Sequence, residues 1–182
     1  SDAPEPNPSG DQKYQDFGHS HWRNSLFYGE NLVNISITGP GLLHGTGLDK
    51  SDTPPAWSGN KTIALKNCRN VLLRDFSILH GGHFGVLATG VDNLTIYNLR
   101  IDTNRDGIDI DCCRDVRIAN CEVNSPYDDA ICLKSSYALG EIRATERVAI
   151  TNCQVSGYVE GSMLDGTYDR NDPAGSPRTA RD

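Results

Sequence analysis

The feature that most constrains this chain is a repeat of 22 or 23 residues. Segments 70–78, 93–101 and 115–123 share one pattern: a polar first residue, apolar second and fourth residues, a turn residue at the sixth position, and apolar seventh and ninth residues. Segment 147–155 repeats this pattern after 32 residues, and 34–39 is a shorter early copy. A period of this length is typical of solenoids, in which each repeat buries its apolar face only against its neighbours.

Each copy of the repeat reads as two short strands joined by a bend, because apolar and polar residues alternate on both sides of the turn residue. A second set of segments rich in β-forming residues, 84–88, 106–110 and 129–133, recurs at the same spacing. Three β segments per repeat predict a coil of three strands that stacks on the next coil in parallel sheets. The expected fold class is therefore all-β, a parallel β-helix.

Asparagines occupy the predicted bends. Asn98, Asn120 and Asn152 share one position of the repeat. Asparagine tolerates a left-handed backbone, and its side-chain amide can bond an equivalent amide in the next coil. We therefore interpret these three residues as a structural ladder rather than as functional groups.

The repeat also sets the expected organisation of the chain. Residues 1–30 are predicted to be a loop-rich N-terminal segment, 31–167 the coils, and 168–182 a polar tail. The first ten residues have neither the basic start nor the apolar stretch of a signal peptide. A solenoid needs caps, since open strand edges pair with other chains, and neither end offers one. We expect a solenoid truncated at both ends, cut from a longer protein that is monomeric when complete.

Composition excludes several classes of protein. The chain has 17 basic and 24 acidic side chains and a net charge of −7, and its basic residues are scattered, so a nucleic-acid partner is not expected. Its apolar runs are too short to cross a membrane. No Cys-x-x-Cys pair suggests zinc. We expect no cofactor and no bound metal.

Three carboxylates carry the strongest chemical signal. Asp106 and Asp129 hold equivalent positions in consecutive coils, which places their Cα atoms about 4.8 Å apart, and Asp128 precedes Asp129. Like charges stacked in register are unfavourable, and the same arrangement raises one carboxyl pKa, as a general acid requires. Such a trio suits glycoside hydrolysis, whereas the alternative is that these residues cap turns. Asp109 alternates with Ile108 and Ile110 and is expected to face outward as a solvated residue.

The residues around these acids resemble a known family. Asn104-Arg105-Asp106-Gly107 and, 22 to 23 residues after Asp106, Asp128-Asp129 are similar to the Asn-Thr-Asp-Gly and Asp-Asp motifs of the polygalacturonases, glycoside hydrolase family 28. The resemblance runs from about Asn31 to Thr167. It implies a right-handed parallel β-helix of the pectin-lyase-like type that hydrolyses galacturonan or rhamnogalacturonan by an inverting route.

The resemblance also implies roles for individual residues. Asp128 would be the general acid, while Asp106 and Asp129 would hold and activate the attacking water. Asn104 would orient this group or contact the substrate. Lys134 follows the Asp-Asp strand and is either a partner for a sugar carboxylate or an ordinary surface lysine.

Two family features are missing from the chain. Where the family has Gly-His-Gly, this sequence reads Val159-Glu160-Gly161-Ser162, so that Glu160 takes the place of histidine; the Arg-Ile-Lys motif that would bind the substrate carboxylate is not present. An acidic protein that binds an acidic polymer needs local cations, and Arg105, Arg143 and Lys134 are the candidates. His83 lies one coil before Asp106 and either reaches the cleft or is a plain loop histidine.

The leading hypothesis from the sequence is a pectin-directed glycosidase whose partner is a polysaccharide. One alternative is a β-helix polysaccharide lyase, in which clustered aspartates bind Ca²⁺ and an arginine or lysine abstracts a proton. Another is a β-helix that binds carbohydrate without turning it over. The resemblance further implies a secreted or periplasmic protein.

Overall fold

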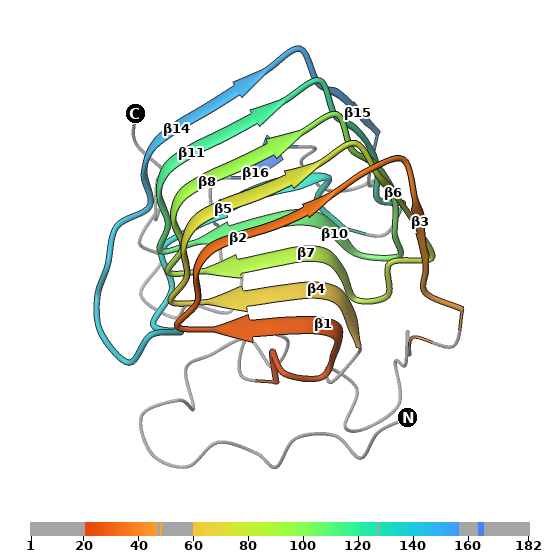
Figure 1. The fold of residues 1–182 in the computed structure, drawn as a ribbon. Coiled ribbons are helices and arrows are strands. Elements are labelled where there is room, and N and C mark those ends of the chain that lie inside the picture. The colour runs from red at the N-terminus through yellow and green to blue at the C-terminus, as the bar shows by residue number, and fades with distance from the viewer. Residues whose placement is uncertain (1–20, 47, 49–59, 127, 157–163, 166–182) are drawn as a thin grey trace, which may run out of the picture.

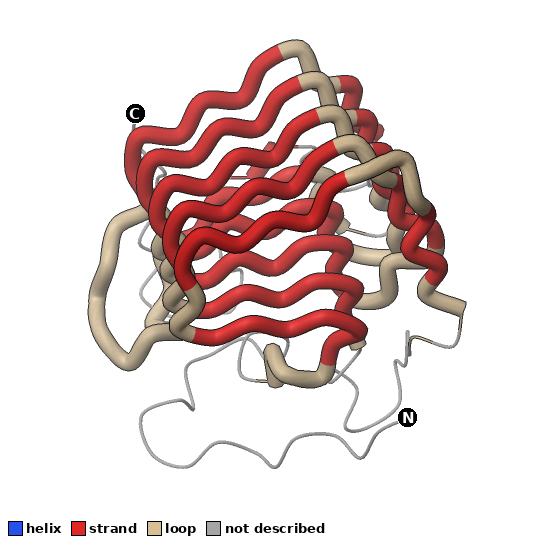
Figure 2. Tube along the Cα trace, viewed as in Figure 1, coloured by secondary structure: helices blue, strands red, loops and turns tan. Residues whose placement is uncertain are grey.

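The computed structural model describes residues 21–46, 48, 60–126, 128–156 and 164–165. Within these ranges the chain forms only strands, turns and loops, and no helix is long and apolar enough to span a membrane. Successive coils of three strands stack along one axis, and the strands are joined by tight turns and by longer loops, such as the one over residues 135–145 (Figures 1 and 2). The predicted all-β parallel β-helix is confirmed.

Sheet A is the face that carries the candidate acids. Its strands, in spatial order, are β1 (Ser25–Glu30), β4 (Lys61–Lys66), β7 (Phe84–Thr89), β10 (Asp106–Asp111), β13 (Ile131–Lys134) and β16 (Leu164–Asp165). β1 lies inside the segment 1–30, so the prediction of a loop-rich segment up to residue 30 is wrong at its end. Leu26, Phe27 and Tyr28 are consecutive and all exposed, so this strand lacks the alternation by which the others were found.

Sheets B and C complete each coil. Sheet B consists of β2 (Val33–Thr38), β5 (Arg69–Arg74), β8 (Asp92–Tyr97), β11 (Arg114–Ala119) and β14 (Glu146–Thr151). Sheet C consists of β3 (Leu42–His44), β6 (Ser77–Leu79), β9 (Arg100–Asp102), β12 (Glu122–Asn124) and β15 (Gln154–Ser156). All neighbouring strands within each sheet are parallel, and they pair in the register of the sequence repeat.

The core lies inside the coil and is built from stacked rows of equivalent residues. Val71, Leu94 and Val116 form one row across sheet B, and each is almost fully buried. Burying a side chain of this kind stabilises the fold by roughly 1.5–3 kcal/mol relative to leaving it exposed. The row is possible because the period of two sends every second residue of each strand inward.

The bends contain the predicted asparagine ladder. Asn98, Asn120 and Asn152 have φ values of 52°, 57° and 50°, all in the left-handed region. Asn152 Nδ2 donates to Asn120 Oδ1 over 2.6 Å, and Asn98 Nδ2 donates to Asp75 Oδ1 over 2.9 Å. The structural interpretation of these residues is confirmed.

The outer face of sheet A is buried as well, and this positions the site. Ala64, Leu87, Asp109 and Cys132 occupy one row across β4, β7, β10 and β13. They point away from the core row of Ile108, yet each has at most 1% of its surface exposed. Charged side chains on this face therefore depend on partners from within the protein.

Candidate active site

The start of β10 and the turn before β13 bring the three predicted acids together. Ile108 pairs with Ile131, and the Gly107 N–H donates to the Asp129 carbonyl over 2.9 Å. Asp106 and Asp129 are thus equivalent residues of adjacent coils, as the repeat predicts. One carboxylate oxygen from each of Asp106, Asp128 and Asp129 lies within 4.8 Å of the other two.

Glycine at position 107 is required by this close approach. A Cβ atom there would lie 2.4 Å from the Ala130 carbonyl oxygen and 2.2 Å from Val123 Cγ1. Both distances are far below van der Waals contact, so any larger residue would push the two coils apart. Gly107 therefore sets the spacing of the acids that flank it.

Asp106 is the most deeply placed member of the trio. Its side chain is 5% exposed, and Lys134 Nζ lies 3.2 Å from its Oδ2. Burial raises the pKa of Asp106 well above its usual range, and the Lys134 ammonium offsets part of that rise. Neighbouring carboxylates raise this pKa further. A carboxyl group in such surroundings holds a proton at a pH where an ordinary aspartate has lost it.

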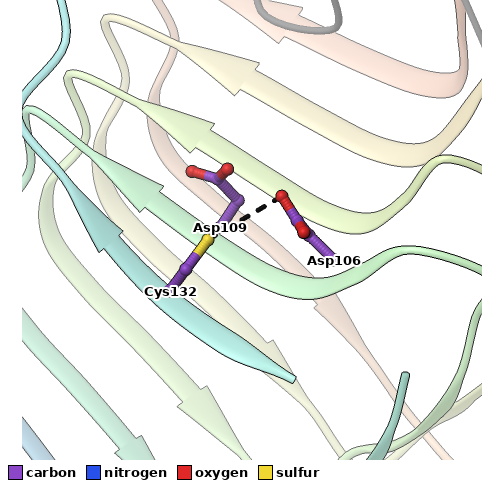
Figure 3. A group of neighbouring side chains, drawn as sticks. All are labelled: Asp106, Asp109 and Cys132. Carbon is purple, nitrogen blue, oxygen red and sulfur yellow. Dashed lines mark hydrogen bonds between the residues drawn. The ribbon is translucent and has the colours of Figure 1, made fainter. Parts of the chain in front are cut away.

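Asp109 joins the same group, although the sequence placed it among solvated residues. It does face outward, but it has no exposed surface, so the expectation of a solvated side chain is wrong. Lys134 Nζ lies 2.7 Å from Asp109 Oδ2, and this ion pair offsets part of the cost of the burial. Figure 3 shows Asp109 and Asp106 beside Cys132, whose Sγ lies 3.8 Å from Asp106 Oδ2.

Cys132 is a neutral member of this buried group. Burial raises the pKa of its thiol well above the usual range, and the Asp109 carboxylate adds to that rise. A protonated thiol acts as a weak donor rather than a nucleophile. Cys132 therefore fills space beside the acids and points its hydrogen at Asp106.

Lys134 bridges two carboxylates instead of lying on the surface. Its side chain is 19% exposed, and its ammonium contacts Asp106 and Asp109 at once. The interpretation as an ordinary surface lysine is therefore wrong. The register explains the contact, because Lys134 lies opposite Asp111 and so diagonally from Asp109 on the same face.

Asp128 has a different cation. Arg105 Nε donates to Asp128 Oδ2 over 2.7 Å, and Arg105 Nη2 contacts the same oxygen. The other oxygen, Oδ1, accepts the backbone N–H of Asp129 over 3.1 Å. Both carboxylate oxygens of Asp128 are thus engaged. The pair is more open than the Lys134 group, with 34% of the Arg105 side chain and 24% of the Asp128 side chain exposed.

Comparison with known proteins now assigns the family. Residues 49–172 match the family model described as a right-handed β-helix region. The chain belongs to the right-handed β-helix family. Among solved structures, the β-helix protein is similar to one from Parabacteroides merdae that is provisionally named a glycosyl hydrolase, with 17% identity and a TM-score of 0.54. The match covers 69% of this chain and 59% of that one, so this chain spans less than two thirds of the length of that chain.

The structural likeness at this identity concerns the fold. No curated protein matches the chain. The right-handed parallel β-helix expected from the resemblance is therefore shown, while the chemistry of this β-helix protein rests on its own residues.

The remaining predicted residues lie around the acids or outside the described ranges. His83 is 4% exposed, packs edge-on against Phe84 with ring centroids 4.6 Å apart, and lies 3.4 Å from Arg105 Nη1 through Nε2. The Asn104 N–H donates to the Gly82 carbonyl over 3.3 Å. Arg143, a candidate cation, instead pairs with Asp92. Glu160 lies outside the described residues.

Proposed function

We propose that this β-helix protein is a glycoside hydrolase acting on polysaccharides that contain galacturonic acid. The observation that carries the proposal is the convergence of Asp106, Asp128 and Asp129, with oxygens within 4.8 Å of one another. Glycosidases use one carboxyl to protonate the leaving oxygen and another carboxylate to activate water or attack the sugar. The name of the Parabacteroides merdae protein is compatible with this class of reaction.

The exposure of the acids supports separate roles. Asp128 is more exposed than Asp106, 24% against 5% of the side chain, and a proton donor must reach the glycosidic oxygen. We assign the donor role to Asp128. Asp106, which only a small molecule could approach, would hold the water in place through its protonated carboxyl, and Asp129 would activate that water.

The proposal leaves two stereochemical courses of hydrolysis, inversion and retention, to be distinguished. Resemblance to the polygalacturonases favours inversion. Separations of roughly 5–5.5 Å between carboxyl groups are typical of retaining enzymes and larger ones of inverting enzymes, so the close packing of this trio favours retention. The configuration of the newly formed reducing end, read by NMR within seconds of cleavage, decides between them.

A calcium-dependent lyase is the second candidate. The observation that favours it is the same group of three oxygens, since Ca²⁺ binds carboxylates. A lyase leaves an unsaturated sugar that absorbs in the ultraviolet, whereas a hydrolase leaves a saturated one. Loss of activity in chelator together with ultraviolet absorbance would support the lyase.

The test is release of reducing sugar from polygalacturonate and from rhamnogalacturonan, with chelator present. We expect activity in the parent protein and a loss of about 100- to 10,000-fold in Asp128→Asn. The matched control is Asp115→Asn, which removes an aspartate from an exposed arginine pair with Arg147 on sheet B and should leave activity unchanged. Absence of activity on both polymers would contradict the proposal, and sugar binding without turnover would indicate a binding module.

A further inference from the structure

The two cations at the candidate site hold their carboxylates in different ways. Lys134 sits between Asp106 and Asp109, whose side chains are 5% and 0% exposed. Moving its ammonium away would leave two buried carboxylates without that charge, which costs several kcal/mol. Arg105 and Asp128 are 34% and 24% exposed. Replacing Asp128 by another carboxylate as the partner of Arg105 therefore costs much less free energy.

The pair between Arg105 and Asp128 occupies one oxygen of the residue to which we assign the donor role. Two guanidinium nitrogens contact Oδ2, and the Asp129 N–H occupies Oδ1. A carboxyl that protonates a leaving oxygen needs one oxygen directed at the substrate. In the structure as it stands, Oδ2 is turned to Arg105, and Oδ1 keeps one acceptor site beside the Asp129 N–H. Opening of the contact with Arg105 leaves Oδ2 to the substrate.

Arg105 is suited to such an opening. Its backbone is held, because its carbonyl accepts the Ser125 hydroxyl, while its side chain is 34% exposed and contacts His83 Nε2 over 3.4 Å. The guanidinium is planar and always charged, and its donors match any carboxylate. A sugar carboxylate can therefore replace Asp128 as the partner of Arg105, and a neutral sugar cannot.

We propose that Arg105 is an exchangeable cation, which holds Asp128 in the empty site and passes to the carboxylate of an acidic sugar when substrate binds. This inference rests on the proposed function and adds to it the origin of selectivity. An acidic substrate frees Asp128 by taking Arg105, whereas a neutral substrate leaves Asp128 engaged. Arg105 thus binds the sugar carboxylate and releases Asp128 in the same step.

The test compares binding of trigalacturonate with binding of its methyl ester, measured by titration calorimetry on the whole chain. We expect the acid to bind about tenfold more tightly than the ester. In Arg105→Gln the two affinities should agree within about twofold. Arg147→Gln is the matched control, since Arg147 forms an exposed pair with Asp115 on sheet B, and it should keep the tenfold ratio.

A double-mutant cycle separates exchange from simple charge repulsion. Removing the competing carboxylate in Asp128→Asn should tighten acid binding about two- to fivefold, the worth of an exposed ion pair. The same change made in Arg105→Gln should give no tightening. Equal tightening in both backgrounds would overturn the proposal, because repulsion alone would then explain it, and weaker binding in Asp128→Asn would overturn it as well.

These experiments also distinguish failure of the exchange from failure of the proposed hydrolase function. Turnover of polygalacturonate with an unchanged acid-to-ester ratio in Arg105→Gln would refute the exchange and leave the hydrolase intact. Absence of both binding and turnover in the parent protein would refute both. Thermal unfolding of each variant, compared with the parent, verifies that the binding changes do not come from loss of fold.

Discussion

Two stacks of polar side chains run along this solenoid, and they are satisfied in different ways. In the bends, Asn152 donates to Asn120 and Asn98 donates to Asp75, so that neutral amide donors meet acceptors of the neighbouring coil within the stack itself. At the start of sheet A, the carboxyl groups of Asp106 and Asp129 are stacked, and an ionised carboxylate offers no donor to its neighbour. Asp106 keeps its place through the Lys134 ammonium and through burial, which raises its pKa so that it holds a proton. A self-complementary stack serves the fold, whereas a stack of carboxyl groups that depends on other residues and on a held proton indicates chemistry.

The largest expected effect is on the rate of hydrolysis, which should distinguish the stack of acids from the stack of amides. Asp106→Asn keeps the shape of the side chain and removes its ability to hold and exchange a proton. We expect the rate of hydrolysis to fall about 100- to 10,000-fold. Asn120→Gly, a change in the other stack, should leave the rate within about twofold. Equal loss in both variants would mean that the acids act only through the fold.

The next effect concerns the cation that holds the buried acids. Lys134→Met leaves Asp106 and Asp109 without their ammonium, and we expect the free energy of unfolding to fall by about 3–5 kcal/mol. Urea denaturation measures this change. Adding Asp109→Asn to Lys134→Met should recover part of the loss, because one buried charge is then removed. A loss below about 1 kcal/mol would show that water already solvates these carboxylates.

The pH dependence of stability sharpens the contrast further. The pKa of Asp106 is raised in the folded protein, so above the unfolded value of about 3.9 the native state binds more protons than the unfolded chain. Stability from this group is complete below that value and is lost as the pH rises toward the raised native pKa. The slope reaches at most about 1.4 kcal/mol per pH unit.

This slope should disappear in Asp106→Asn, which cannot titrate. Denaturation of the parent protein and the variant at a series of pH values from 4 upward provides the comparison. Parallel curves would contradict a proton held by Asp106 in the folded state.

The smallest effect belongs to the ladder. Asn120→Gly keeps a residue that tolerates the left-handed backbone at φ 57° and removes the acceptor of the Asn152 amide. We expect a loss of about 1 kcal/mol in the free energy of unfolding. Thermal denaturation measures it, and a loss above about 3 kcal/mol would mean that the bend contributes more than one hydrogen bond.

Much of the fold follows from the sequence because stacking copies one local pattern. The offset of 23 residues between Asp106 and Asp129 becomes strand register in the structure, and the apolar alternation becomes the core rows. Strand β1 was not predicted, since Leu26, Phe27 and Tyr28 do not alternate. At an end coil, exposure on the open side removes the pattern on which the prediction depends.

Less of the candidate site than of the fold could be predicted from the sequence. The period of two correctly gives the direction of Asp109, but it does not tell whether an outward face is solvated or covered. The ion pairs also depend on how far each long side chain extends. Lys134 contacts two carboxylates on β10, and Arg105 contacts Asp128 in the next coil. The strand register limits which residues can form these ion pairs, but it does not decide which of the possible pairs form.

The most direct test of the central claim is an NMR analysis of the products formed from polygalacturonate by the parent protein in chelator. Hydrolysis by the three acids predicts saturated galacturonate ends that are absent from a parallel reaction with Asp128→Asn. Unsaturated ends, or saturated ends formed equally well by the variant, would contradict a hydrolytic centre built on Asp106, Asp128 and Asp129.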